Sequence, residues 1–221
     1  MHVNLLLINF QGYLTSKPTC GTIIHLNMKR NVHEEDLSDV IELLRKHRVY
    51  VVTIGSNTMV NSADTFKQLY TMSVGSNGLL SYDDDSDFDR IYSYLVTGFT
   101  ESNPYYVASA QVSGKGSVEL PMFHKLSGSG YIEIGVNTQD HAGPVSNRAV
   151  SVNFDGPTKS YPVPLQYETG TFIFQSYDNF DLSQDYNMTL DYQYTDNQIQ
   201  TMDIRIHVNV PVNQWPPYPS N

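Results

Sequence analysis

Cysteine and basic residues are scarce in this chain, and each shortage excludes a class of site or partner. The single cysteine, Cys20, permits no disulfide within the chain and no zinc site built on cysteines. We expect Cys20 to be a buried free thiol, or else to pair with another chain or with a stretch missing from this one. Thirteen Lys and Arg stand against twenty-three Asp and Glu, which gives a net charge of −10. Because phosphates and anionic membrane surfaces are held by clustered cations, nucleic acid and such surfaces are not expected as partners.

Long hydrophobic runs are absent as well. No apolar run in the sequence approaches the roughly 18 residues that span a bilayer, so no transmembrane segment is expected. Residues 1–10 contain a short apolar core but neither a basic start nor an Ala-x-Ala-like cleavage site. We therefore expect a strand or an irregular segment there, and no convincing signal peptide.

The chain does have a moderate apolar content and many tyrosines. Hydrophobic residues make up 40% and charged residues 16%, which is enough for a core and too little charge for a disordered chain. The 16 tyrosines favour β-structure, in which one side of the ring packs while the hydroxyl reaches water.

Residues 20–97 predict an alternation of strands and helices. The run from Val49 to Ile54 is continuous and rich in β-branched residues, which is typical of a strand buried on both faces of a parallel sheet. Apolar residues spaced three and four apart predict helices, with Ser62 and Asp87 as N-caps of the later two. The expected elements are strands at 21–26, 49–54 and 78–82 and helices at 34–47, 63–73 and 87–95.

From Tyr105 onward the apolar period changes to two, which predicts antiparallel strands with one wet face. About seven such strands over this length are typical of a sandwich. The clearest pair, 186–194 and 204–210, is expected to form a hairpin. Its inward residues are Met188, Leu190, Tyr192, Ile204, Ile206 and Val208, and its outward residues are Thr189, Asp191, Gln193, Arg205 and His207.

Three segments of the first part resemble the second half of a von Willebrand factor A-type domain. Residues 21–26 look like the strand before that domain's metal-site loop, 40–55 like its helix and buried strand, and 87–95 like its final helix. Together with the Tyr-rich second part, the chain is similar to a family of nematode proteins in which a degenerate A-type half precedes a β-sandwich. That resemblance implies an extracellular, secreted protein, N-terminally truncated here, from a family linked in part to gut responses and innate immunity.

The expected fold class is therefore α/β plus all-β. We expect an incomplete von Willebrand factor A-like α/β domain at 1–98, which is the C-terminal half of such a unit, followed by an antiparallel β-sandwich at 104–210. Residues 211–221 are expected to form an extended Pro-rich tail.

The metal site of an A-type domain is not expected in this chain. The Asp-x-Ser-x-Ser strand is missing, and Asn27–Arg30 replaces the Thr-Asp-Gly of the A-type pattern, so that Lys29 would repel Mg²⁺. The acidic run at 83–89 fails the EF-hand register, because Phe88 stands where Gly is needed and Tyr94 where Glu is needed. We expect a solvated loop there, and neither a metal ion nor another cofactor.

Enzymatic motifs are missing too. No Gly-x-Ser-x-Gly hydrolase motif is present. The segment Ser113–Ser117 lacks the first Gly of a P-loop, and it has Gly116 where Ser or Thr must follow Lys. The seven histidines are dispersed along the chain. His25 is expected to be a packed strand residue, and His207 is expected to lie on a polar face. No catalytic residue is assigned, and the chain is expected not to be an enzyme.

Two features indicate roles at the surface. Asn187-Met188-Thr189 is a glycosylation sequon on the polar face of its strand, so Asn187 is the candidate glycosylation site. An unknown protein or glycan ligand would use exposed aromatic residues, although these residues could equally belong to the core. The candidates are Tyr105, Tyr106, Tyr131, Tyr161 and Tyr177.

Three functional hypotheses remain open from the sequence. The first is a non-enzymatic extracellular interaction protein with a defence-related or matrix-related role. The second is a truncated gene product or isoform without independent activity, because an incomplete parallel sheet would leave an open edge and uncovered apolar surface. A hydrolase with an unrecognised site is a distant third.

Overall fold

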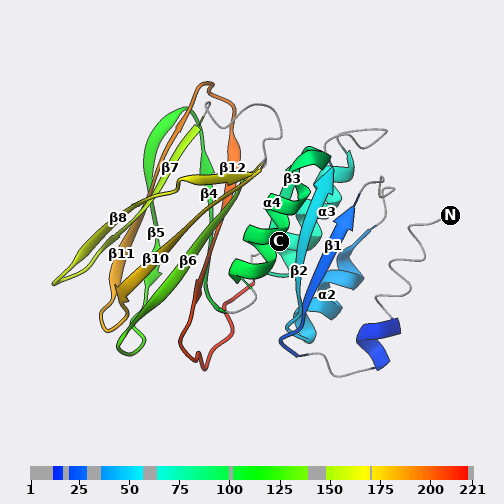
Figure 1. Cartoon of the computed structure of the whole chain (residues 1–221), viewed down its shortest axis with the longest axis horizontal. Coiled ribbons are helices and arrows are strands. Elements are labelled where there is room, and N and C mark those ends of the chain that lie inside the picture. The colour runs from blue at the N-terminus through cyan, green and yellow to red at the C-terminus, as the bar shows by residue number, and fades with distance from the viewer. Residues whose placement is uncertain are drawn as a thin grey trace. The chain divides into compact units, whose positions relative to one another are not determined.

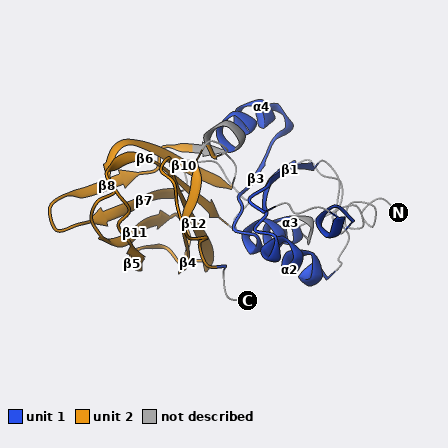
Figure 2. Ribbon diagram, turned by 90° about the horizontal axis from the view of Figure 1, so that it is seen from below, with its two compact units in different colours: residues 1–96, 218–221 blue, residues 97–217 orange. Residues whose placement is uncertain are grey.

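The chain folds into two compact units in the computed structural model (Figure 1). The first unit contains residues 1–96 and 218–221, and the second contains residues 97–217 (Figure 2). The structure describes residues 12–16, 20–28, 36–56, 64–99, 102–138, 148–169 and 171–218. The strand or irregular segment predicted at residues 1–10 lies outside this set.

The first unit is built on a small parallel sheet. Its strands are β1 (Ile23–Met28), β2 (Tyr50–Ser56) and β3 (Leu80–Asp83), in the order β1-β2-β3. The central strand β2 is buried at every position, as its β-branched sequence predicted. The chain runs so close to β2 before β3 that a Cβ atom on Gly78 would lie 1.9 Å from the carbonyl oxygen of Val51. Only glycine fits at that position.

Helices cover both faces of this sheet. They are α2 (Ser38–Lys46), α3 (Asp64–Gly75), a 3-10 turn η1 (Asp85–Asp87), α4 (Phe88–Tyr92) and a π-helical turn η2 (Ser93–Gly98). Figure 2 shows α2 and α3 on one side of the sheet and α4 on the other. The core beneath α2 and α3 consists of apolar residues at helical spacing and of strand residues, among them Leu26, Val40, Leu44, Val51, Leu69 and Leu80.

Two helix caps predicted from the sequence have different outcomes. Asp87 makes no side-chain capping hydrogen bond. Its carboxylate instead accepts a hydrogen bond of 3.2 Å from Nε of Arg90, because the opposite charge lies one helical turn away. The other predicted cap, Ser62, lies outside the described residues.

The von Willebrand factor A-like α/β unit predicted for residues 1–98 is not supported. Only three of the twelve strands in the described ranges belong to the parallel sheet, and nine belong to antiparallel sheets, so the fold is predominantly antiparallel β. A buried β-branched strand followed by an amphipathic helix occurs in many α/β arrangements. The segments that carried the resemblance therefore specify element types and not that domain.

The second unit is a sandwich of two antiparallel sheets. The first sheet has the strand order β4-β12-β6-β10-β9 and the second has the order β5-β11-β7-β8. Apolar residues from the inner faces of both sheets form the core, which includes an aromatic group of Phe123, Phe154, Phe180 and Tyr186. The strands are β4 (Asn103–Val112), β5 (Lys115–Phe123), β6 (Ser129–Thr138), β7 (Arg148–Asp155), β8 (Ser160–Pro164), β9 (Tyr167–Thr169), β10 (Phe172–Asp181), β11 (Tyr186–Tyr194) and β12 (Gln200–Val208).

The predicted hairpin between β11 and β12 is wrong. Strand β11 pairs with β5 and β7, whereas β12 pairs with β4 and β6, so the connection between them crosses from one sheet to the other. The alternation within β11 is as expected, since Leu190 is buried and Asp191 and Gln193 are exposed.

The outward face of β12 is not wet, which corrects a second prediction. Arg205 and His207 are only 1% and 5% exposed. The ring of Phe99 stands edge-on to His207 with centroids 4.8 Å apart, and it also contacts the ring of Phe172. The neighbouring Gly135 leaves the room for this packing, because a Cβ atom there would lie 2.8 Å from Phe172. The ring of Phe99 thus covers His207 on the polar face of this sheet.

Several polar side chains on the same face are paired with one another. Glu133 accepts hydrogen bonds from the hydroxyls of Ser102 at 2.7 Å and Tyr131 at 2.5 Å, and Asp203 accepts one from Ser109 at 2.5 Å. Burial, followed by the hydrogen bond to Glu133, raises the pKa of Tyr131 to about 12. Such pairing is what allows charged groups to remain in a buried layer.

Candidate functional site

A groove of about 830 Å³ lies on the second unit, where the edge strands of its two sheets meet. We call it the edge groove. Strands β4 and β5 are the first strands of their sheets, and both supply lining residues. The lining comes from three separate segments. The first is Tyr105–Val107 of β4, and the second is the end of β5 with the loop after it, Pro121–Ser127 without Phe123. The third follows β12 and is Pro211–Pro217 without Val212.

Both edge strands are irregular at the groove. In β5, Pro121 and Met122 together stand opposite the single residue Asn187 of β11. In β4, Tyr105 is the extra residue opposite the step from Ile206 to His207. Such bulges bend a strand and change the direction of its side chains. They place consecutive residues of β4 along one groove, which a regular strand would not do.

Two tyrosine hydroxyls tie the bulged strands together. The hydroxyl of Tyr105 donates a 2.7 Å hydrogen bond to the carbonyl of His124, and the hydroxyl of Tyr106 donates one of 2.7 Å to the carbonyl of Pro121. Both rings also pack against Phe123, with centroid distances of 5.0 and 6.1 Å. Burial raises the pKa of each tyrosine, so both hydroxyls remain protonated donors at neutral pH.

The loop after β5 is held by the turn between β10 and β11. The backbone N–H of Lys125 donates to Oδ1 of Asp185 at 2.7 Å, and the N–H of Leu126 donates to the carbonyl of Leu182 at 2.7 Å. Nδ1 of His124 lies 3.6 Å from the same carboxylate oxygen. The Asp185 carboxylate is therefore directed at the loop backbone, and this fixes where the His124 and Lys125 side chains begin.

The third wall is the segment predicted as a Pro-rich tail. It combines Pro216 and Pro217 with Trp215, the one tryptophan of the chain, and with the exposed amides of Asn213 and Gln214. Sequence reasoning treated these residues as an extended appendage. An aromatic residue beside proline and amide residues was the available signal that this segment could line a groove.

The five tyrosines proposed as binding residues divide between surface and core. Tyr105 and Tyr106 line the edge groove. Tyr131 belongs to the covered polar network around Glu133, and Tyr161 packs within the core against Phe180, with ring centroids 4.4 Å apart. The ring of Tyr177 stands edge-on to Tyr161, so it is part of the same packing. Two of the five are therefore placed at the groove, of which Tyr106 is only 7% exposed and belongs to the sandwich core as well.

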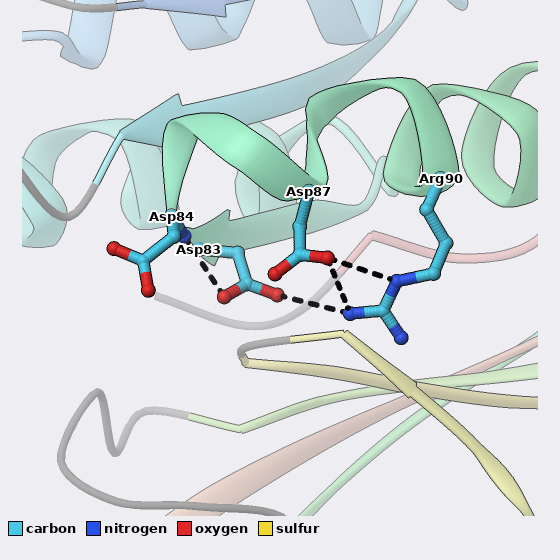
Figure 3. A network of polar contacts seen from close by, with 4 residues as sticks. All are labelled: Asp83, Asp84, Asp87 and Arg90. Atoms are coloured by element: carbon cyan, nitrogen blue, oxygen red, sulfur yellow. Dashed lines mark hydrogen bonds and ion pairs between the residues drawn. The ribbon is translucent and has the colours of Figure 1, made fainter.

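The acidic run at 83–89 is organised around a cation of its own (Figure 3). Arg90 lies 3.1 Å from Asp87 and 3.9 Å from Asp83, and the backbone N–H of Asp84 donates to Asp83. Burial raises the pKa of Asp83. Among the described residues, no group of three or more His, Cys, Asp or Glu is arranged to hold a metal ion. Of the predicted Mg²⁺-repelling segment, Lys29 and Arg30 lie outside the described residues.

The remaining residues named in the sequence analysis differ in their exposure to solvent. Asn187 is exposed on the outer face of β11, and Cys20 is exposed, which corrects the expectation of a buried thiol. His25 is half-buried in β1, and burial lowers its pKa. No helix in the described ranges is long and apolar enough to span a membrane.

Comparison with protein families finds one match, which is to a domain of unknown function (DUF7154) over residues 108–209. These residues lie within the sandwich unit. No curated protein matches the chain.

Comparison with solved structures finds weak similarities to carbohydrate-binding proteins. A Clostridium thermocellum xylanase fragment with CBM22 and GH10 modules, complexed with xylohexaose, is 13% identical over 55% of this chain and 29% of that one, with a TM-score of 0.28. A carbohydrate-binding module of Cellvibrio mixtus lichenase 5A, complexed with cellotriose, is 11% identical over 48% of this chain and 89% of that one, with a TM-score of 0.24. A mutant of the family 29 module CBM29-2 is 7% identical over 50% and 77% of the two chains, with a TM-score of 0.26.

Proposed function

We propose that this protein is a non-catalytic binding module that holds an extended polysaccharide in its edge groove. The observation that carries the proposal is the composition of the groove, where Trp215, Asn213 and Gln214 line the same groove as Tyr105 and Tyr106, whose hydroxyls are both hydrogen-bonded. Its volume of about 830 Å³ is in the range of small-molecule sites.

Sugar rings have two kinds of surface that such a groove matches. Their C–H faces are apolar and pack on aromatic rings, as Trp215 and Tyr105 would allow. Their hydroxyls donate and accept hydrogen bonds, and an amide side chain offers both functions. Asn213 and Gln214 are exposed and supply those groups beside the tryptophan.

Preorganisation supports binding by the same residues. The Tyr105 and Tyr106 hydroxyls are already bonded to the carbonyls of His124 and Pro121, and both rings pack against Phe123. Side chains that are fixed before the ligand arrives lose little conformational entropy on binding. The groove therefore offers a rigid aromatic platform on one side.

Affinity electrophoresis in gels that contain soluble polysaccharides tests the proposal. The wild-type protein should be retarded by at least one of xylan, laminarin, polygalacturonate or chondroitin sulfate. Trp215→Ala should migrate as in a gel without polysaccharide, while Trp215→Phe, which keeps an aromatic ring, should retain part of the retardation. If none of these polymers retards the wild-type protein, the proposal is overturned. A protein ligand would then be sought for the groove.

We further propose that the protein acts outside the cell and carries a glycan on Asn187. The side chain is exposed on the outer face of β11, and the sequon's Thr189 follows it on the same face. Protein secreted from eukaryotic cells should lose apparent mass on treatment with an N-glycosidase, and Asn187→Gln should already have the lower mass. Wild-type protein of unchanged mass would contradict this assignment.

A further inference from the structure

The ionisable side chains that line the edge groove, tyrosines apart, are both basic. They are His124 and Lys125, and no Asp or Glu is among the lining residues. This is unusual for a chain with a net charge of −10, in which acidic residues outnumber basic ones by twenty-three to thirteen. The lining therefore contains one fixed cation, Lys125, and no carboxylate, and the Asp185 carboxylate lies beside it, 3.6 Å from His124.

The charge of Lys125 is available to a ligand. Among the described residues its ammonium group has no hydrogen bond or ion pair, although its backbone N–H is bonded to Asp185. The nearby Asp185 carboxylate accepts that backbone bond and lies 3.6 Å from His124. Lys125 is thus anchored through its backbone, and its side chain remains exposed at the groove.

We propose that the edge groove selects acidic polysaccharides, in which uronic acid carboxylates or sulfate esters recur along the chain, and that Lys125 reads that charge. The inference rests on the proposed polysaccharide binding and adds the class of ligand. A polymer with an anion on every sugar brings one opposite Lys125 in any register, and a polymer with an anion on every second sugar does so in every other register. The aromatic wall would hold the sugar rings, and Lys125 would distinguish acidic chains from neutral ones.

The test compares ligands that share a backbone and differ only in charge. Polygalacturonate is paired with its fully methyl-esterified form, and dextran sulfate with dextran. Binding is followed by the fluorescence of Trp215 and by affinity electrophoresis. The first pair tests carboxylate recognition and the second tests sulfate recognition.

Three variants isolate the role of Lys125. Lys125→Gln should weaken binding of the charged polymer about three- to fivefold, as expected for an exposed ion pair, and leave binding of its neutral partner within about twofold. Lys125→Arg should restore the preference. Lys115→Gln is the matched control, because Lys115 is exposed at the opposite end of β5, on the order of 30 Å away at about 3.3 Å per residue.

The outcomes separate the inference from the function on which it rests. Preference for at least one charged polymer, lost in Lys125→Gln and kept in Lys115→Gln, supports the inference. Equal binding of charged and neutral partners, or an equal effect of both lysine substitutions, overturns the inference and leaves polysaccharide binding in place. A wild-type protein that binds neither member of either pair overturns the proposed function together with the inference.

Discussion

The hydroxyl of Tyr106 donates a 2.7 Å hydrogen bond to the carbonyl oxygen of Pro121 and so ties one bulged edge strand to the other. Pro121 has no N–H, so its carbonyl is the one backbone group that needs a partner there. A sandwich corner is a place where edge strands expose unpaired backbone groups. This bond satisfies such a group and forms the floor of the edge groove at the same time.

Tyr106→Phe should therefore destabilise the second unit and weaken ligand binding. Loss of the bond leaves a partly buried carbonyl unsatisfied, at a cost of about 1–3 kcal/mol. Tyr192→Phe is the control, because Tyr192 is half-buried in the same unit and its hydroxyl has no hydrogen bond among the described residues. Chemical denaturation measures both. Equal free energies of unfolding for the two variants would contradict the role of the Tyr106 bond.

The buried His207 predicts a dependence of stability on pH. Burial, followed by the charge of Arg205, lowers the pKa of His207 to about 3. In the unfolded chain the group titrates near 6.5, so below that pH the unfolded state binds a proton that the folded state excludes. Stability from this group is therefore fully present above pH 6.5 and is lost as pH falls towards 3.

Denaturant unfolding between pH 6.5 and pH 5 measures this effect. The free energy of unfolding should fall by up to about 1.4 kcal/mol per pH unit in the lower part of this range. His207→Gln should flatten the slope, because a neutral side chain then occupies the site under Phe99. An identical slope in the variant would show that His207 is not the group responsible.

Core and surface positions of β11 should respond differently to truncation. Leu190 is fully buried in the sandwich, so Leu190→Ala should cost about 2–5 kcal/mol. Gln193 is exposed on the outer face, so Gln193→Ala should change stability by less than about 0.5 kcal/mol. Thermal unfolding of the full chain gives both values. Similar costs at the two positions would mean that the register of β11 is wrong.

The acidic run should not bind divalent cations tightly. Arg90 already neutralises Asp83 and Asp87, and a metal ion would have to displace it (Figure 3). Calorimetric titration with Ca²⁺ or Mg²⁺ should give no saturable heat. A dissociation constant below a millimolar for either ion would contradict this, and Arg90→Ala would then show whether the run is the site.

The sequence predicted which residues form each strand better than it predicted which other segments pack against that strand. The alternation of β11 placed Leu190 inside and Gln193 outside correctly, because period two records the two faces of any strand. The same pattern in β12 placed His207 in water, but Phe99 from a distant segment covers it. Alternation shows that a face is polar and does not show whether another layer lies on it.

The edge groove could not be predicted for a related reason. Tyr105, Pro121 and Trp215 come from three segments that are far apart in the chain, and the bulges that bring their side chains together leave no pattern in the sequence. The search for tyrosines with exposed rings named Tyr105, which is half-buried at the groove, but it also named Tyr106 and Tyr161, which are core residues. Composition identifies aromatic residues, and only the strand pairing shows which of them share a surface.

Fluorescence titration of Trp215 tests the central claim most directly, because this residue is the one tryptophan in the chain and it lines the edge groove. Addition of polygalacturonate or chondroitin sulfate to the folded protein should change the emission intensity or wavelength along a saturable curve. The same curve should weaken in Lys125→Gln. Emission that stays constant with every polysaccharide tested, from protein shown to be folded by circular dichroism, would contradict polysaccharide binding in the edge groove.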